Sequence, residues 1–171
     1  SSGTPAIKIL KLDENDSTIR LKGAEFSLQQ VEYNSETNEF EEDGSSKLTG
    51  TTSDDGSYTF DNIQTNVIYS LTETKAPSGY LVNNTPHYIA FDISGDDNSN
   101  FLNDIPEDIK EDIFICYTKT TCSYPVYNAS IKMPETGFVG IGTNIFVIIG
   151  GCIILVATYL YILFYRKINN K

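Results

Sequence analysis

Residues 67–80 read VIYSLTETKAPSGY, and this stretch decides the fold class. Val67, Tyr69, Leu71 and Glu73 occupy every second position, which is the pattern of a β-strand with one buried face. The Pro-Ser-Gly turn at 77–79 follows and limits the length of the strand. Glu73 is therefore predicted on the same face as three apolar side chains, where a charge needs a partner.

Similar short strands are predicted on both sides of this segment. They cover residues 6–13, 23–33, 58–60, 88–93, 113–117 and 124–129, with polar turns between them. Residues 34–44 are predicted as an acidic loop, and residues 94–111 as an insertion at the domain edge with a short helical start at 106–108. The last two strands are expected to form a hairpin that closes the sheet. The pattern predicts an all-β sandwich over residues 5–131.

Two more polar residues interrupt apolar faces in the same way as Glu73. Lys11 is in phase with Ile7 and Ile9, and Asn128 is in phase with Tyr124 and Val126. A buried lysine tends to lose its proton and a buried carboxyl tends to hold one. We therefore expect the Lys11 amine to attack the Asn128 carboxamide while Glu73 polarises the carbonyl and moves protons. The product is a Lys–Asn isopeptide bond, with release of ammonia.

Two alternatives to this reaction stay open at the level of sequence. The three residues can instead form a buried Lys11–Glu73 salt bridge with Asn128 as a hydrogen-bonded neighbour, although such pairs often add little net stability. The acceptor can also be Asn103, which is in phase with Phe101 and Ile105.

The C-terminal region has three parts in a fixed order. Residues 133–137 read MPETG, residues 138–165 carry no charge, and residues 166–171 hold three positive charges. The 21 residues from Ile145 to Tyr165 are long enough to cross a bilayer as a helix of roughly 31 Å. The positive tail predicts a cytoplasmic C-terminus, so residues before Met133 are expected outside the membrane.

Four segments resemble Cna B-type domains of Gram-positive adhesins and pilins. They are residues 7–13 (IKILKLD), 21–28 (LKGAEFSL), 55–60 (DGSYTF) and 73–80 (ETKAPSGY, an E-x-x-A-P-x-G-Y segment). The resemblance covers residues 6–93 well and 94–131 loosely. It implies a small prealbumin-like, inverse immunoglobulin-like sandwich. It also implies a self-made isopeptide bond, with Lys11 and Glu73 on the matching positions and an Asn or Asp acceptor in the last strand.

The MPETG segment resembles the LPxTG sorting signal, with Met133 in place of leucine. In that family a sortase cysteine cuts between the residues matching Thr136 and Gly137. It then joins the threonine carbonyl to an amine of peptidoglycan or of a pilin lysine. Pro134 and Glu135 complete the motif. The resemblance implies a protein covalently attached to the cell wall, whose helix at 138–165 is removed on sorting. The methionine leaves the sortase class open.

Composition excludes several classes of function. Residues 1–136 hold 9 of the 12 basic residues and all 23 acidic ones, a net charge of −14 that argues against nucleic-acid binding. No nucleophile–histidine set, phosphate loop or zinc spacing is present, so we expect no cofactor, no metal site and no enzyme, and a structural His87. Cys116 and Cys122 can form a disulfide outside the cell, and Cys152 is expected to pack within the span.

The features together predict the wall-anchored stalk or minor pilin module of an adhesin. Alternatives are the stalk of a surface enzyme with its catalytic domain upstream, and a module that itself binds a host matrix protein through residues 94–111 or its tyrosine-rich strands. The chain begins Ser1-Ser2-Gly3, without a methionine or a signal peptide, so we expect it to be the C-terminal piece of a longer chain.

Overall fold

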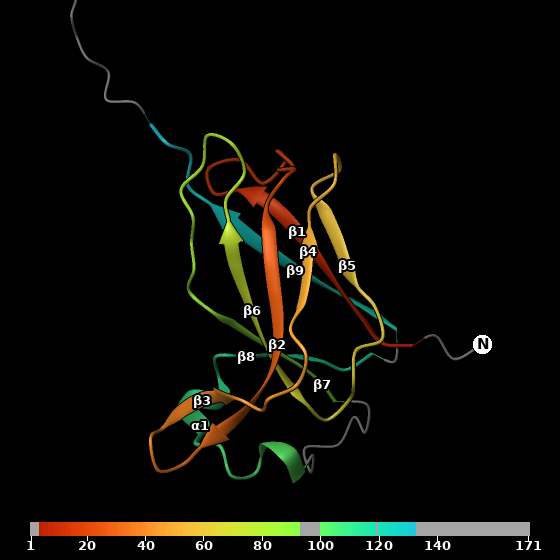
Figure 1. The fold of residues 1–171 in the computed structure, drawn as a ribbon, viewed down its shortest axis with the longest axis vertical. Helices are drawn as coiled ribbons and strands as arrows, with labels where there is room; N and C mark the ends of the chain where they lie inside the picture. The colour runs from red at the N-terminus through yellow and green to blue at the C-terminus, as the bar shows by residue number, and fades with distance from the viewer. Residues whose placement is uncertain (1–3, 93–99, 119, 133–171) are drawn as a thin grey trace, which may run out of the picture. The chain divides into compact units, whose positions relative to one another are not determined.

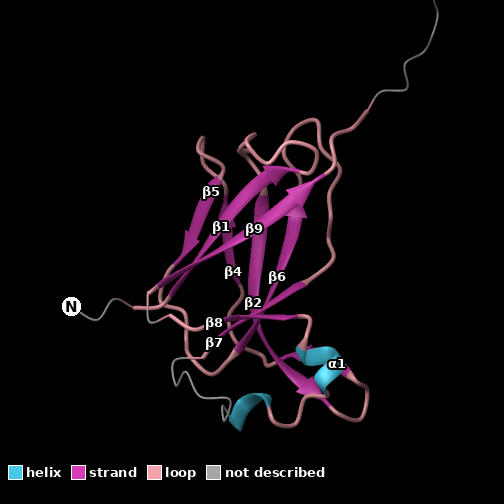
Figure 2. Ribbon diagram, turned by 180° about the vertical axis from the view of Figure 1, so that it is seen from behind, coloured by secondary structure: helices cyan, strands magenta, loops and turns pink. Residues whose placement is uncertain are grey.

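A computed structural model describes residues 4–92, 100–118 and 120–132. These residues fold almost entirely as β-strands, and Ser1–Ile131 forms one compact unit. Figures 1 and 2 show two layers of strands facing each other, with two short helices at one end. The helical elements are η1 (Asn100–Leu102) and α1 (Glu107–Lys110).

The strands form two sheets. The smaller sheet has the order β5-β1-β9, and the larger has the order β3-β2-β6-β7-β8, with β4 also paired to β2. The bounds are β1 Ala6–Asp13, β2 Glu25–Asn34, β3 Glu39–Glu42, β4 Leu48–Thr51, β5 Ser57–Phe60, β6 Ile68–Lys75, β7 His87–Phe91, β8 Ile113–Cys116 and β9 Thr121–Asn128.

The first and last strands are neighbours and run parallel. All eight residues of β1 pair with β9, from Ala6 opposite Thr121 to Asp13 opposite Asn128. Parallel strands cannot be joined by a tight turn, and here the rest of the domain lies between them in the chain. The N- and C-terminal strands are thereby held side by side along their length, as Figure 1 shows.

The main core lies between the two sheets. Side chains of alternating strand positions fill it, and the most enclosed are fully or almost fully buried: Ile7, Ile9, Phe26, Leu28, Leu71, Ile89 and Phe91. A second cluster buries Leu102 and Ile105, from the predicted insertion, with Val31, Ile68 and Ala90 of the larger sheet. The insertion therefore packs through apolar side chains and contributes a small core of its own.

Two predictions about the strands are wrong. Residues 34–44 are not only a loop, because β3 returns along β2 with Phe40 opposite Tyr33. The acidic composition hid this strand, whose only partly buried residue is Phe40. The last two strands do not form a hairpin either. Instead β8 pairs parallel to β7 in the larger sheet, and β9 pairs with β1 in the smaller one.

No helix within the described ranges is long and apolar enough to cross a membrane. The predicted span at 138–165 and the basic tail at 166–171 lie outside the described residues.

The core between the sheets predicts a large difference between two phenylalanines. Phe91 is completely buried, whereas Phe114 is 42% exposed at a sheet edge. Phe91→Ala should lower the free energy of unfolding by about 3–5 kcal/mol, because it leaves a cavity in the core. Phe114→Ala should cost about 1 kcal/mol or less. Urea denaturation of both variants measures the difference, and equal losses would contradict this description of the core.

Candidate functional site

Three polar residues meet inside the main core: Lys11, Glu73 and Asn128. Their exposed fractions are 0%, 1% and 1%. Lys11 pairs with Val126 in the parallel β1–β9 ladder, so Asn128 lies two residues farther along β9 on the same face. Glu73 comes from β6 in the opposite sheet, where it pairs with Phe26. The site therefore joins the two sheets and both terminal strands.

The Asn128 carboxamide lies between the amine and the carboxylate. Lys11 Nζ donates a hydrogen bond to Asn128 Oδ1. Asn128 Nδ2 donates to Glu73 Oε2 at 2.8 Å and to Oε1 at 3.0 Å. The Lys11 and Glu73 charges are themselves 3.6 Å apart, between Nζ and Oε1. The nucleophile thus faces the carbonyl side of the amide, and the carboxylate faces the nitrogen that would leave.

The segment after the Pro-Ser-Gly turn completes the site. The backbone N–H of Asn83 donates to Glu73 Oε2 at 2.9 Å, and Asn128 Nδ2 also donates to the Leu81 carbonyl at 2.8 Å. Gly79, at φ +86°, allows the turn. Every residue has the same backbone N–H and carbonyl groups, so nothing in the sequence indicated the contributions of Leu81 and Asn83.

Burial changes the acidity of the lysine. Removal from water lowers the pKa of Lys11 from 10.5 to about 8, and the nearby Glu73 carboxylate offsets part of this effect. The neutral amine of Lys11 is therefore more accessible at neutral pH than that of an exposed lysine. The ring centroid of Phe26 lies 6.0 Å from Nζ and closes the site on its apolar side. A neutral amine held against a carboxamide, with a carboxylate beside it, has the parts needed for amide exchange.

The other predicted residues lie elsewhere. Asn103 is exposed in the turn between η1 and α1, whereas the residue hydrogen-bonded to Lys11 is Asn128. Cys116 and Cys122 form a disulfide. It connects the end of β8 to the start of β9 and therefore joins the two sheets, rather than the two strands of a hairpin. The sorting motif at Met133–Gly137 and Cys152 lie outside the described residues.

One further residue, expected from the sequence to be structural, lies beside the site. His87 pairs with Leu71, two residues before Glu73, and is in phase with Ile89 and Phe91 on the buried face of β7. The alternation of His87 with Ile89 and Phe91 was the sequence signal that could have placed it there. Burial lowers the pKa of His87 from its ordinary 6.5, as does the Lys11 charge, while the Glu73 charge opposes them.

The two-layer fold and the buried Lys–Glu–Asn cluster define a class of small β-sandwich domain. The sequence model of the SpaA family, described as a prealbumin-like fold domain, matches residues 5–104. The chain therefore belongs to the SpaA family of prealbumin-like domains, and the predicted all-β sandwich is confirmed.

Two of the solved structures to which this chain is similar are pilins. The full-length major pilin SpaD from Corynebacterium diphtheriae is 23% identical with a TM-score of 0.50, over 75% of this chain and 31% of that chain. The group B streptococcus pilus 2b backbone protein is 23% identical with a TM-score of 0.46, over 74% of this chain and 41% of that chain. The present chain thus spans less than half of either pilin. No curated protein sequence matches it.

The buried ion pair predicts a partner-dependent cost. Lys11→Met leaves the Glu73 charge buried without a countercharge, so the double variant Lys11→Met/Glu73→Gln should be more stable than Lys11→Met by about 3 kcal/mol. Neither variant has the amine, so the comparison is independent of any covalent bond at Lys11. Denaturant unfolding at pH 7 provides the measurement.

An exposed ion pair supplies the control. Lys75 and Glu25 lie 2.8 Å apart with side chains 66% and 44% exposed. Lys75→Met should change the free energy of unfolding by no more than about 1 kcal/mol. If Lys11→Met and Lys11→Met/Glu73→Gln are equally stable, the site does not isolate the Glu73 charge from water.

Proposed function

We propose that this chain is the cell-wall-proximal stalk or minor pilin module of a Gram-positive surface protein. A Lys11–Asn128 isopeptide bond stabilises it, and a sortase attaches it to the wall through Thr136. The observation that carries the proposal is the buried site in which Asn128 lies between the Lys11 amine and the Glu73 carboxylate. Membership of the SpaA family and the similar fold of the major pilin SpaD support it.

The proposed reaction balances within the three side chains. Glu73 first takes a proton from the Lys11 ammonium, and the neutral Nζ attacks Cγ of Asn128. The carboxyl then gives its proton to Nδ2 and takes the second proton from Nζ as the Cγ–Nδ2 bond breaks. Ammonia leaves, Glu73 ends as a neutral carboxyl, and a secondary amide joins Lys11 to Asn128. Two buried charges are thereby removed, which favours the product in a dry core.

The position of the bond suggests a mechanical role. Lys11 lies near the end of the first strand and Asn128 ends the last, so tension between the N-terminal side and Thr136 would pass through the cross-link. Residues 12–127 would carry almost none of it. Forced unfolding is governed by the unfolding barrier, and a covalent bypass removes the extension that unfolding of these residues would give.

The sorting part of the proposal uses residues outside the described ranges. Met133–Gly137 begins just after Lys132, and Ile131 is the last residue of the compact unit. The cleavage site would therefore follow the domain closely, with the uncharged segment at 138–165 holding the precursor in the membrane until transfer. The carbonyl of Thr136 would then be joined to an amine of peptidoglycan or of a pilin lysine.

The isopeptide bond predicts a mass deficit. The purified full chain should be lighter than its sequence mass by one ammonia, beyond the two hydrogens lost by the disulfide. Lys11→Ala, Glu73→Gln and Asn128→Ala should each restore the ammonia, because each removes one reacting or proton-moving group. Asn103→Ala should keep the deficit. Intact-mass spectrometry after reduction of the disulfide decides the matter, and a full-mass wild type would refute the bond.

Sorting predicts a dependence on one threonine. In a Gram-positive host with its own sortases, the wild-type chain should be released from the wall by muramidase as fragments ending at Thr136 with the acceptor attached. Thr136→Ala should remain with the membrane, and Thr85→Ala, at an exposed residue in the domain, should behave as wild type. Wall-linked Thr136→Ala would refute attachment through this residue.

A further inference from the structure

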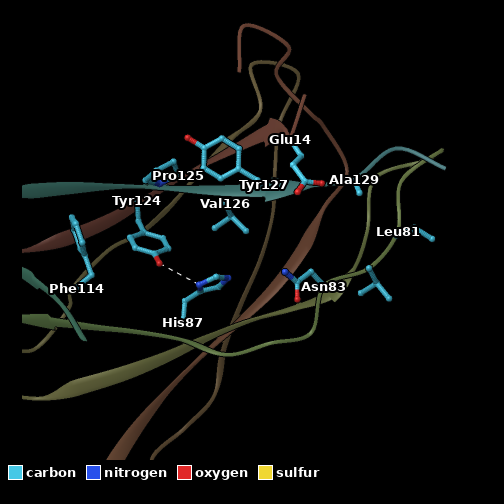
Figure 3. Close-up of a pocket in the computed structure, with 11 residues that line it drawn as sticks. Glu14, Leu81, Asn83, His87, Phe114, Tyr124, Pro125, Val126, Tyr127 and Ala129 are labelled. Atoms are coloured by element: carbon cyan, nitrogen blue, oxygen red, sulfur yellow. Dashed lines mark hydrogen bonds between the residues drawn. The ribbon is translucent and has the colours of Figure 1, made fainter. Parts of the chain in front are cut away.

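A groove of about 680 Å³ opens beside the buried site. Figure 3 shows Val126 on one side of it, and His87 and Asn83 facing it from the other. Val126 pairs with Lys11, and the backbone N–H of Asn83 donates to Glu73. Two residues that line the groove thus contact or pair with members of the site, so the groove lies directly behind it.

His87 has an unusual polar atom in this position. Its Nδ1 lies 3.2 Å from the Tyr124 hydroxyl, which either donates to or accepts from it, and the two ring centroids are 5.6 Å apart. Its Nε2 is buried, and within the described ranges it is the one buried side-chain nitrogen or oxygen that has no hydrogen-bond partner. Buried polar atoms normally have a partner, so this atom is suited to a small polar molecule that passes it from the core side.

Burial, more than the charges around it, keeps His87 neutral at neutral pH. Burial lowers its pKa below 6.5, the Lys11 charge from β1 lowers it further, and the Glu73 charge from β6 opposes both. From β9 it meets the Tyr124 hydroxyl, and from β8 the groove receives Phe114, which carries no charge. Glu14 and Tyr127 are the remaining titratable residues that line the groove.

We propose that this groove is the route by which ammonia leaves the site, and that Nε2 of His87 binds the ammonia as it departs. This inference rests on the proposed isopeptide bond, because that reaction produces the ammonia. In this step the Cγ–Nδ2 bond breaks, Nδ2 leaves as neutral ammonia, and His87 exchanges no proton with it.

The hydrogen-bonding capacity of ammonia matches that of His87 Nε2. Ammonia both donates and accepts hydrogen bonds, so it matches Nε2 in either tautomer of the neutral ring. The route out of the core otherwise passes apolar side chains such as Val126, where ammonia would have no hydrogen-bond partner. Removing the ammonia also prevents it from attacking the new amide in the reverse direction.

Protonation of His87 would oppose the reaction. An imidazolium can only donate to ammonia, so the contact in which Nε2 accepts a hydrogen bond from ammonia is lost, and the buried site gains a positive charge beside Lys11. The rate of bond formation should therefore fall as pH decreases below 6.5, in the range where His87 gains its proton.

The test times the loss of ammonia in the full chain. The wild type, His87→Phe and His87→Gln are produced as insoluble aggregates and dissolved in denaturant, and the unreacted fraction of full mass is isolated. They are diluted into mild detergent under oxidising conditions at several pH values, and intact mass is followed with time. His87→Phe, which keeps a ring but no polar atom, should react about five to ten times more slowly, as expected for loss of one hydrogen bond. Tyr117→Phe, which removes a hydroxyl from an exposed residue that does not line the groove, should keep the wild-type rate.

The pH profile separates this role from simple packing. His87→Gln keeps a polar atom but does not titrate, so it should lose the part of the acid-side decrease that the wild type shows below pH 6.5. If both His87 variants react at the wild-type rate and with the wild-type profile, the inference is refuted while the isopeptide bond stands. If the wild type never loses ammonia, both are refuted.

Discussion

The structure depends on placing one lysine and one glutamate in a core that excludes water. Each charge loses several kcal/mol of hydration when it is buried, so both need partners with good geometry. Asn128 meets this need because its carbonyl accepts from Lys11 and its amide nitrogen donates to Glu73. The three side chains come from three strands and two sheets, so a shift of any one strand would leave a charge without its partner. The site therefore favours one stacking of the two sheets, and it also holds the groups needed for the proposed reaction.

The parallel pairing of β1 with β9 extends this constraint to the chain ends. It brings the first and last strands into an eight-residue ladder and places Lys11 and Asn128 two register positions apart on one face. The disulfide connects β8 to β9 across the two sheets at the opposite end of β9 from Asn128. Strand β9 is thus held at both ends, by a covalent link at its start and by the buried cluster at its finish. A strand held in this way keeps its register, which the proposed reaction requires.

Sequence periodicity located most strands because a face that must be buried repeats every second residue. It failed for β3 and β4, two short and mostly exposed strands, because nothing in their composition separates them from loops. It failed for the pairing of β8 and β9 because two strands close in sequence are normally partners. In the structure β8 pairs with the free edge of β7 in the larger sheet, and β9 pairs with the free edge of β1 in the smaller sheet. Strand partners depend on which edges are free, and this is a property of the whole fold.

The sequence by itself determined the fold class, the buried phases of Lys11, Glu73 and Asn128, and the order of the C-terminal segments. Each of these follows from local pattern, since alternation and the length of an apolar run are written along the chain. Only the tertiary structure decided that the three side chains meet, that Asn128 rather than Asn103 bonds to Lys11, and that Leu81 and Asn83 close the site with backbone atoms. Those outcomes depend on strand register and on main-chain groups that every residue shares, so no side-chain pattern can encode them in advance.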